Sequence, residues 1–527
     1  MNTLINVGNV VKTQKRTKNV YKSILKWKGL LPFLIFFIVL FSRILFAFQT
    51  PEFGDDSAYF VLIQMESIAQ TGLPALESQV LGEISLFPPV FYYILGFFNL
   101  FMPSSFVAKI IPNIFASLTV FIVYLLSMKF TRNHNASLFA SALSGFIPIF
   151  FLRTFNSISI YSLVVPLVLF SFYSFLMINT DEKYIFWYIA SILVLSFTHP
   201  SVFFVIAGQI LYFTFVKIEG LQYKDVEVEV IFVSIFLGIW SQFLIFKNAF
   251  LIHGPSIIWQ NTPSQMLGEL FRGISIVEAI SLIGPVPAIA GAYVFYQYVK
   301  DKKSKFIFFF LSYTIPVFFM LWLKLIEPRV GLILLSSALV VVLGKYYIAF
   351  TSYLEKTKFS KFKILILIFV GVVIYFTSVL PTFALVTDEI NNAPSYEKVQ
   401  ILQWASHNLD SDSIVLSSFE DAFLIRYHSG LRTVIDSNFL SFDDVDVIVD
   451  DINSFFTAQS LIRALNIIEK YDVDYVFLSD TVVEKYARSE IFYNSDCFRK
   501  IFSGRGVGNE LFEVTCSLVS TGERNGR

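Results

Sequence analysis

The chain has 527 residues, of which 55% are hydrophobic and 15% are charged, and its mean hydropathy is +0.65. This composition excludes an ordinary soluble globular protein and indicates a polytopic membrane protein. Acidic and basic residues balance at 40 each, so the net charge is zero and only the distribution of the charges is informative. Aromatic residues make up 17% of the chain and suit lipid-facing helices, so we expect a lipid bilayer as partner and no nucleic acid.

Apolar runs that are long enough to cross a hydrocarbon core predict about eleven transmembrane helices within residues 29–382. They are expected at residues 29–48, 105–130, 136–152, 157–178, 184–199, 200–217, 229–248, 274–298, 305–323, 330–350 and 363–382. The fifth and sixth runs are short and meet at His199-Pro200, so this boundary is the weakest part of the count.

Basic residues in short connections predict the orientation of these helices. The tail 1–28 is rich in lysine, which places the N-terminus in the cytoplasm, and no cleavable signal follows it. If the helices alternate, the other basic connections are cytoplasmic as well. These connections are 129–132, 217–224, 300–305 and 356–363. Loop 49–104 has no Lys, Arg or His and falls outside, as does the C-terminal part, and we expect a multi-pass protein of the plasma membrane.

Two parts on the outer side are predicted to be structured. In the outer loop, residues 57–70 and 87–98 are expected to form helices that lie at the membrane interface. Residues 383–527 contain short β-type runs that alternate with helical segments, which predicts an extracytoplasmic α/β domain with a partly parallel sheet. The strands are expected at 413–417, 433–435 and 475–478, and the helices at 396–408 and 458–471. Whether Cys497 and Cys516 form a disulfide stays open at this point.

Polar residues from distant loops share the predicted outer face. They include Asp55, Asp56, Glu83, Arg153, His199, Glu327 and Arg329. Each one alone has an ordinary explanation, such as a solvated loop, an arginine at the interface or a histidine at a helix junction. Together they suit the transfer of a sugar from a lipid phosphate. A carboxylate takes a proton from the acceptor, and nearby cations neutralise the leaving phosphate.

Cofactor and nucleotide signals are weak or absent in the sequence. Neither a Walker-type nor a Rossmann-type glycine motif occurs in the required setting, so a lipid-linked donor is favoured over a nucleotide sugar. Asp55, Asp56 and Glu83 have the hard oxygen ligands that a divalent metal prefers, although no spacing demands a metal. We therefore expect no certain cofactor and keep a divalent metal as an open alternative.

The motif order resembles that of the GT-C fold glycosyltransferases, in particular the protein O-mannosyltransferases and the lipid A aminoarabinose transferase. The similarity lies in Gly54-Asp55-Asp56-x-x-Tyr59, followed by Pro88-Pro89-x-x-Tyr92-Tyr93. The family usually has Asp-Glu at the acidic pair, and its first acid is the catalytic base. Arg153, His199 and Arg329 stand at elements that are similar to the family's Ser-Arg, Thr-Lys-Pro and Arg-Tyr elements, and the last two differ by His for Lys and Val for Tyr.

This resemblance implies an integral membrane glycosyltransferase that moves one sugar from a polyprenyl-phosphate donor to a protein or glycolipid acceptor at the outer face. Asp55 would act as the base, Asp56 would support it, and Arg153, His199 and Arg329 would surround the donor phosphate. The substrate cavity would be lined by Tyr59, Glu83, Pro88, Pro89, Tyr92, Tyr93 and Glu327. The Trp-Trp-Asp-Tyr-Gly signature of oligosaccharyltransferases is absent, which disfavours transfer of a whole oligosaccharide.

Two other classes of function fit parts of the sequence. A polytopic transporter or flippase of a lipid-linked or small polar substrate would also carry charges along its helices, although no internal repeat is found. A scaffold without enzymatic activity would leave Asp55 solvated. Its distance from both Arg153 and His199 would then be roughly 15 Å or more, beyond the ~10 Å over which exposed charges interact at moderate salt.

Overall fold

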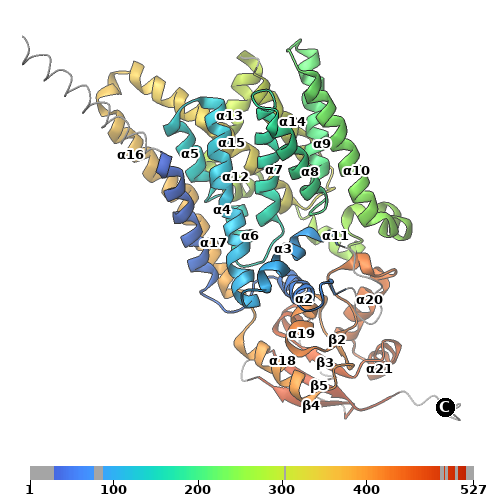
Figure 1. The fold of residues 1–527 in the computed structure, drawn as a ribbon. Coiled ribbons are helices and arrows are strands. Elements are labelled where there is room, and N and C mark those ends of the chain that lie inside the picture. The colour runs from blue at the N-terminus through green and yellow to red at the C-terminus, as the bar shows by residue number, and fades with distance from the viewer. Residues whose placement is uncertain are drawn as a thin grey trace, which may run out of the picture.

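The computed structural model describes residues 29–75, 87–301, 304–486, 492, 496–504 and 508–517 (Figure 1). The basic tail 1–28 and the predicted site residue Glu83 lie outside these described residues. The chain forms a long bundle of helices, and a smaller domain built on a sheet covers one end of it (Figure 1).

The bundle contains a helix at each segment that the sequence predicts to be transmembrane. The first helix covers Gly29–Ala47. The others are α4 (Ser104–Thr131), α5 (His134–Ser144), α6 (Pro148–Phe155), α7 (Tyr161–Met177), α8 (Lys183–Ser196), α9 (Val202–Ile218), α10 (Asp225–His253), α11 (Ser264–Leu270), α12 (Ile276–Ile283), α13 (Pro285–Asp301), α14 (Lys305–Trp322), α15 (Pro328–Lys356), α16 (Lys363–Ile374) and α17 (Leu380–Asn391).

Length and composition support fewer spans than the eleven that we predict. In the described part of the chain, six helices are long and apolar enough to cross a membrane, and two bent pairs raise the number to eight. The three remaining segments, α7, α8 and α9, are apolar helices of 14–17 residues. A polytopic membrane protein is therefore supported, and the count of eleven stays a prediction.

Proline and glycine explain where the two bent pairs break. α5 and α6 meet at 50°, and Pro148 begins α6. α12 and α13 meet at 100°, where Gly284 has φ +95° and Pro285 begins the next helix. Proline lacks the N–H that would continue a helix, and glycine adopts a positive φ without a steric penalty. The first break turns α6, which carries the predicted site residue Arg153.

The last helix of the bundle runs past the predicted domain boundary at residue 382. α16 continues through a π segment, Tyr375–Val379, into α17, which ends at Asn391. Hydropathy falls where the apolar run ends, but the backbone stays helical for two to three more turns. This extension carries Glu389 beside Gly54.

Two helices of the outer loop lie between the bundle and the smaller domain, as Figure 1 shows. They are α2 (Asp56–Thr71) and α3 (Val90–Asn99), close to the two interfacial helices that the sequence predicts. α2 packs against α3 on one side and against the smaller domain on the other, and its buried residues include Tyr59 and Met65. The outer loop is therefore enclosed by protein on two sides.

The smaller domain contains a mixed five-stranded sheet. Its elements are α18 (Tyr396–Asn408), β1 (Ile414–Leu416), α19 (Ala422–Ser429), β2 (Arg432–Thr433), α20 (Val445–Phe456), α21 (Leu461–Lys470), β3 (Tyr475–Leu478), α22 (Asp480–Tyr486), β4 (Phe498–Ser503) and β5 (Glu510–Val514). The strand order is β2-β1-β3-β5-β4, with β2, β1 and β3 parallel and the last two antiparallel to their neighbours. The three predicted strands are present, whereas the sequence pattern missed β4 and β5.

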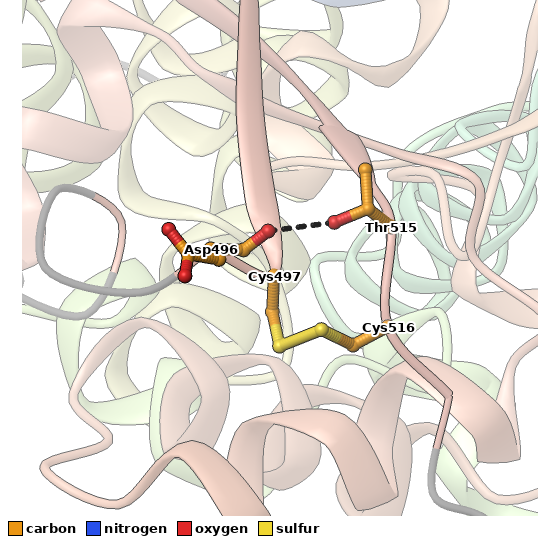
Figure 2. The surroundings of a disulfide bond; sticks show 4 residues. All are labelled: Asp496, Cys497, Thr515 and Cys516. Atoms are coloured by element: carbon orange, nitrogen blue, oxygen red, sulfur yellow. Dashed lines mark hydrogen bonds between the residues drawn. A yellow bond between two sulfur atoms is a disulfide. The ribbon is translucent and has the colours of Figure 1, made fainter.

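A disulfide joins the ends of β4 and β5, which are neighbouring strands at one edge of the sheet. Cys497 precedes β4, Cys516 follows β5, and their sulfur atoms are bonded (Figure 2). The hydroxyl of Thr515 donates to the carbonyl of Asp496 at 2.8 Å beside the bridge (Figure 2). The pairing that the sequence left open is thus present in the structure.

The ends of the helices sort into two groups, as an alternating topology requires. Lys129 and Lys305, from two of the predicted cytoplasmic connections, line one pocket. Asp55, Arg153 and Glu327, from three of the predicted outer connections, meet at the end that the smaller domain covers. The two predicted faces are therefore separate in the structure, and which of them is cytoplasmic stays a prediction.

Candidate active site

Asp55, the first residue of the acidic pair Asp55-Asp56, lies at the start of α2 and faces the bundle. Asp55 is the N-cap of α2, and its side chain accepts a hydrogen bond from the backbone N–H of Ser57 at 3.2 Å. Aspartate is a favoured N-cap because its carboxylate satisfies a backbone donor of the first turn. The Asp55 side chain is still 38% exposed, so it remains accessible to a substrate.

Arg153 joins two acids that are far apart in sequence. Its guanidinium lies 3.9 Å from Asp55 Oδ2 and donates to Glu327 Oε1 at 3.1 Å. The three side chains are each about one-third exposed, so their ion pairs are open to solvent. The 3.9 Å distance is far below the roughly 15 Å that a scaffold with a solvated Asp55 implies, and it counts against that alternative.

Glu389 and Arg329 extend this cluster. A Cβ added at Gly54 would lie 3.1 Å from Glu389 Oε1, so the glycine allows the α17 carboxylate to approach the start of α2. Glu389 interacts electrostatically with Arg153, Asp55 and Arg329. Sequence reasoning missed Glu389 because it placed this residue beyond the end of the last transmembrane helix.

His199 contacts the cluster through Tyr161. The backbone N–H of Ser201 donates to His199 Nδ1 at 3.0 Å, so this nitrogen carries no proton. His199 Nε2 lies 3.3 Å from the hydroxyl of Tyr161, which in turn is within electrostatic range of Arg153 and Glu327. The imidazole is therefore neutral in this arrangement, and the fixed positive charges near Asp55 come from the two arginines.

The Pro-Pro-x-x-Tyr-Tyr segment docks beside the His199 junction. Pro88 and Pro89 lead into α3, and the backbone N–H of Val90 donates to the carbonyl of Phe197 at 3.3 Å. Tyr92 is only 8% exposed and packs against aromatic rings, whereas Tyr93 is 41% exposed. Tyr92 is therefore a packing residue of the loop, and Tyr93 faces outward.

The second acid of the pair points away from this cluster and holds the smaller domain. Asp56 accepts hydrogen bonds from the backbone N–H groups of Phe423 at 3.3 Å and Leu424 at 2.8 Å. These groups belong to the first turn of α19, where backbone donors lack partners within the helix. Burial raises the pKa of Asp56 well above that of an ordinary aspartate, despite these two hydrogen bonds. The structure thus places the two acids in different environments.

A second polar contact also ties the outer loop to the smaller domain. Glu52 accepts a hydrogen bond from the hydroxyl of Tyr59 at 2.8 Å and lies 3.3 Å from His428 Nε2. Burial alone would raise the pKa of Glu52, but the hydrogen bonds from His428 and Tyr59 outweigh it, and the net pKa is lowered. Tyr59, expected in a substrate cavity, is 1% exposed and supports Glu52 instead.

Buried cations hold the chain that leads to Asp55. Lys109 is 3% exposed and donates to the backbone carbonyls of Ala47, at 2.6 Å, and Thr50. Arg43 is 1% exposed and bonds Asn113 and Thr154, the residue that follows Arg153. We did not single out either cation from the sequence, although charges inside apolar segments are rare and are usually functional or structural.

The described residues contain no group of three or more His, Cys, Asp or Glu side chains that could hold a metal ion. Of the three proposed ligands, Asp55 pairs with Arg153 and Asp56 bonds the α19 backbone. The third, Glu83, lies outside the described part of the chain. A divalent metal thus stays an open alternative.

Comparison with known proteins shows what the fold is. No protein-family model and no curated protein matches the sequence. An archaeal oligosaccharyltransferase, AglB from Archaeoglobus fulgidus in complex with an inhibitory peptide and a dolichol-phosphate, is similar in structure, with a TM-score of 0.63 and 14% identity over 87% of this chain and 70% of that one. A crystal structure of the Archaeoglobus fulgidus oligosaccharyltransferase in complex with Zn and sulfate is also similar, with a TM-score of 0.61 and 14% identity over 84% of this chain and 67% of that one.

A second enzyme matches over nearly its whole length. ArnT from Cupriavidus metallidurans bound to undecaprenyl phosphate has a TM-score of 0.54 and 11% identity over 93% of this chain and 98% of that one. These likenesses show the fold, and the transporter or flippase alternative gains no support from them. The chain has the fold that these enzymes share, the GT-C fold of membrane glycosyltransferases.

Proposed function

We propose that this protein is an integral membrane glycosyltransferase that moves a single sugar from a polyprenyl-phosphate donor to an acceptor, with Asp55 as the general base. The observation that carries the proposal is the meeting of Asp55, Arg153 and Glu327 at one end of the bundle. These residues come from three connections that are distant in sequence, and the chain that surrounds them has the fold of glycosyltransferases with lipid-linked donors.

The chemistry assigns opposite tasks to the acids and the cations. The Asp55 carboxylate takes the proton from the attacking group of the acceptor as this group bonds to the anomeric carbon. The bond from that carbon to the donor phosphate breaks, and the phosphate leaves with its negative charge. Arg153 and Arg329 stabilise that charge, and His199 and Tyr161 supply neutral hydrogen bonds nearby. Glu327 accepts a hydrogen bond from Arg153 and holds this arginine in place, and the Glu389 carboxylate offsets part of the positive charge of both arginines.

Asp56 has a separate task in this proposal. Its carboxyl group holds α19 of the smaller domain on the start of α2, and so it positions Asp55 without touching the substrate. Glu52 and His428 strengthen the same contact. We place this end of the bundle on the extracytoplasmic side of the plasma membrane, because the basic connections lie at the opposite end. The acceptor is a protein or a glycolipid.

Mass spectrometry of glycans and glycolipids tests the function in cells. We expect one glycosylated species to be missing from cells that lack the protein. The wild-type protein should restore it, and an Asp55→Asn variant at equal membrane abundance should not. If the glycans and glycolipids are the same with and without the protein, the glycosyltransferase function is wrong.

The division of roles has its own test with a purified protein. Arg329→Gln should weaken donor binding by about ten- to a hundredfold, since a charge-assisted hydrogen bond contributes about 1.5–3 kcal/mol. The same variant should leave acceptor affinity within about twofold. Equal losses for donor and acceptor would contradict the phosphate role of Arg329.

A further inference from the structure

A pocket lies at the end of the bundle that is remote from Asp55. Its volume is about 520 Å³, and its walls come from α4, α7, α9, α10, α14 and α15. On α4, twenty residues separate Lys109, which holds the candidate active site, from Lys129, which lines the pocket. At about 1.5 Å per helical residue the two sites are roughly 30 Å apart. The pocket therefore has no part in the proposed transfer.

The pocket lining carries four cations and one carboxylate. Lys129, Arg132, Lys305 and Lys345 come from three different helices or their ends, and the carboxylate is Glu227 of α10. Loops on this face are basic in most membrane proteins, which explains cations at this end of the bundle. That rule does not explain why cations from separate helices line one concave site. Their convergence indicates an anionic ligand.

The single carboxylate serves to fix one wall of the pocket. Glu227 is 2% exposed and accepts hydrogen bonds from Asn179 at 2.5 Å and Tyr212 at 3.2 Å. Lys305 lies 3.5 Å from it, so this lysine is held in a defined position. Lys129 in turn donates to the hydroxyl of Thr180 at 3.0 Å, which holds this side chain beside the pocket.

Aromatic rings lie beside the cations. Phe130 and Phe306 both line the pocket, and their rings stack with centroids 4.2 Å apart. Lys345 lies 4.6 Å from the centroid of the Phe130 ring. A site with cations next to apolar rings, at the ends of membrane-spanning helices, matches an amphiphile with a charged head and an apolar body. Basic pockets between transmembrane helices bind phosphate-bearing lipid headgroups in this way.

We propose that this pocket binds the phosphate headgroup of an anionic membrane phospholipid. The phosphate lies among Lys129, Arg132, Lys305 and Lys345, and the glycerol and upper acyl chains pack against Phe130 and Phe306. This site is independent of the proposed transfer reaction. The lipid-binding proposal therefore does not depend on which reaction the opposite end of the bundle performs.

Lipid binding to the full-length protein tests this proposal. The protein is placed in phosphatidylcholine nanodiscs that contain increasing fractions of phosphatidylglycerol, and bound phosphatidylglycerol is counted by native mass spectrometry. Lys305→Gln and Lys345→Gln should each weaken binding about fivefold, because a basic residue near an anionic lipid contributes about 1 kcal/mol. Among the described residues that line the pocket, Glu227 has the one negative charge, so Glu227→Gln should tighten binding severalfold.

Matched controls separate the pocket from the general basic surface. Lys358 is exposed, lies at the start of the basic segment that follows α15 and does not line the pocket, so Lys358→Gln should change binding less than twofold. Lys129→Gln, at an exposed side chain, replaces Lys305→Gln if the latter fails to fold. Equal losses in the control and in the pocket variants would overturn the proposal. Full competition by millimolar inorganic phosphate would also overturn it, because a free anion would then be the ligand.

Discussion

Removal of the Asp56 carboxyl group should loosen the contact between the outer loop and the smaller domain. In Asp56→Ala the N–H groups of Phe423 and Leu424 lose their acceptors at a buried helix start. A buried donor without a partner costs about 1–3 kcal/mol. Water that enters the opened contact recovers part of this loss, so we expect a destabilisation of the docked state by about 2–4 kcal/mol.

The effect of Asp56 depends on pH in a defined direction. Burial raises its pKa, so the folded protein favours the neutral carboxyl group. The stabilisation from this shift is complete below the ordinary carboxyl pKa of about 4 and is lost as the pH rises through the raised pKa. Asp56→Asn keeps one acceptor oxygen and cannot ionise. Its thermal stability should therefore vary less with pH than that of the wild type in this range.

Hydrogen exchange measured by mass spectrometry is the direct assay of this contact. Peptides that cover α19 should exchange faster in Asp56→Ala by about thirtyfold or more, which is what 2 kcal/mol predicts. Asp55→Asn is the matched control, since Asp55 is adjacent in sequence and does not contact α19. If α19 exchanges at the wild-type rate in Asp56→Ala, the proposed docking role of Asp56 is refuted.

Three further predictions concern residues around the site and the smaller domain. Lys109→Met leaves buried carbonyls without a donor. The free energy of unfolding should therefore fall by about 3–5 kcal/mol in thermal unfolding, and turnover should fall about a hundredfold. Wild-type values for both would contradict the positioning role of Lys109. Glu389→Gln removes a negative charge beside two arginines, so donor binding should tighten about fivefold, or 1 kcal/mol, and weaker binding would contradict the phosphate site. Reduction of the bridge between Cys497 and Cys516 should raise the intact mass of the protein by two hydrogens, and an unchanged mass would exclude the bridge. Cys497→Ser should lower the free energy of unfolding by about 3 kcal/mol in thermal unfolding.

The sequence predicted the parts of the site that carry a local signal. Asp55 follows the first apolar segment in a recognisable motif, and Arg153 and Glu327 stand at helix ends that the charge pattern assigns to the same face. Membrane helices must have their ends at one face or the other, so a correct order of helices brings such residues together. The Arg153 contacts with Asp55 and Glu327 follow from that order.

Other parts of the site depend on long-range packing and could not be predicted. Hydropathy marks where an apolar run ends and not where a helix ends, so Glu389 was missed at the end of α17. Neighbouring residues at a helix start point about 100° apart, and this separates Asp56 from Asp55. The partner of Asp56 is the backbone of α19, more than three hundred residues further along the chain, and nothing in its local sequence indicates this contact.

Sugar transfer by the purified Asp55→Asn variant is the direct measure of whether Asp55 is the catalytic base. Asparagine is as good an N-cap as aspartate, so α2 should start as in the wild type while the base is lost. We expect unchanged thermal stability, donor binding within a few fold of the wild type, and transfer from a polyprenyl-phosphate sugar reduced by about a thousandfold or more. Wild-type turnover by this variant would contradict the assignment of Asp55 as the catalytic base.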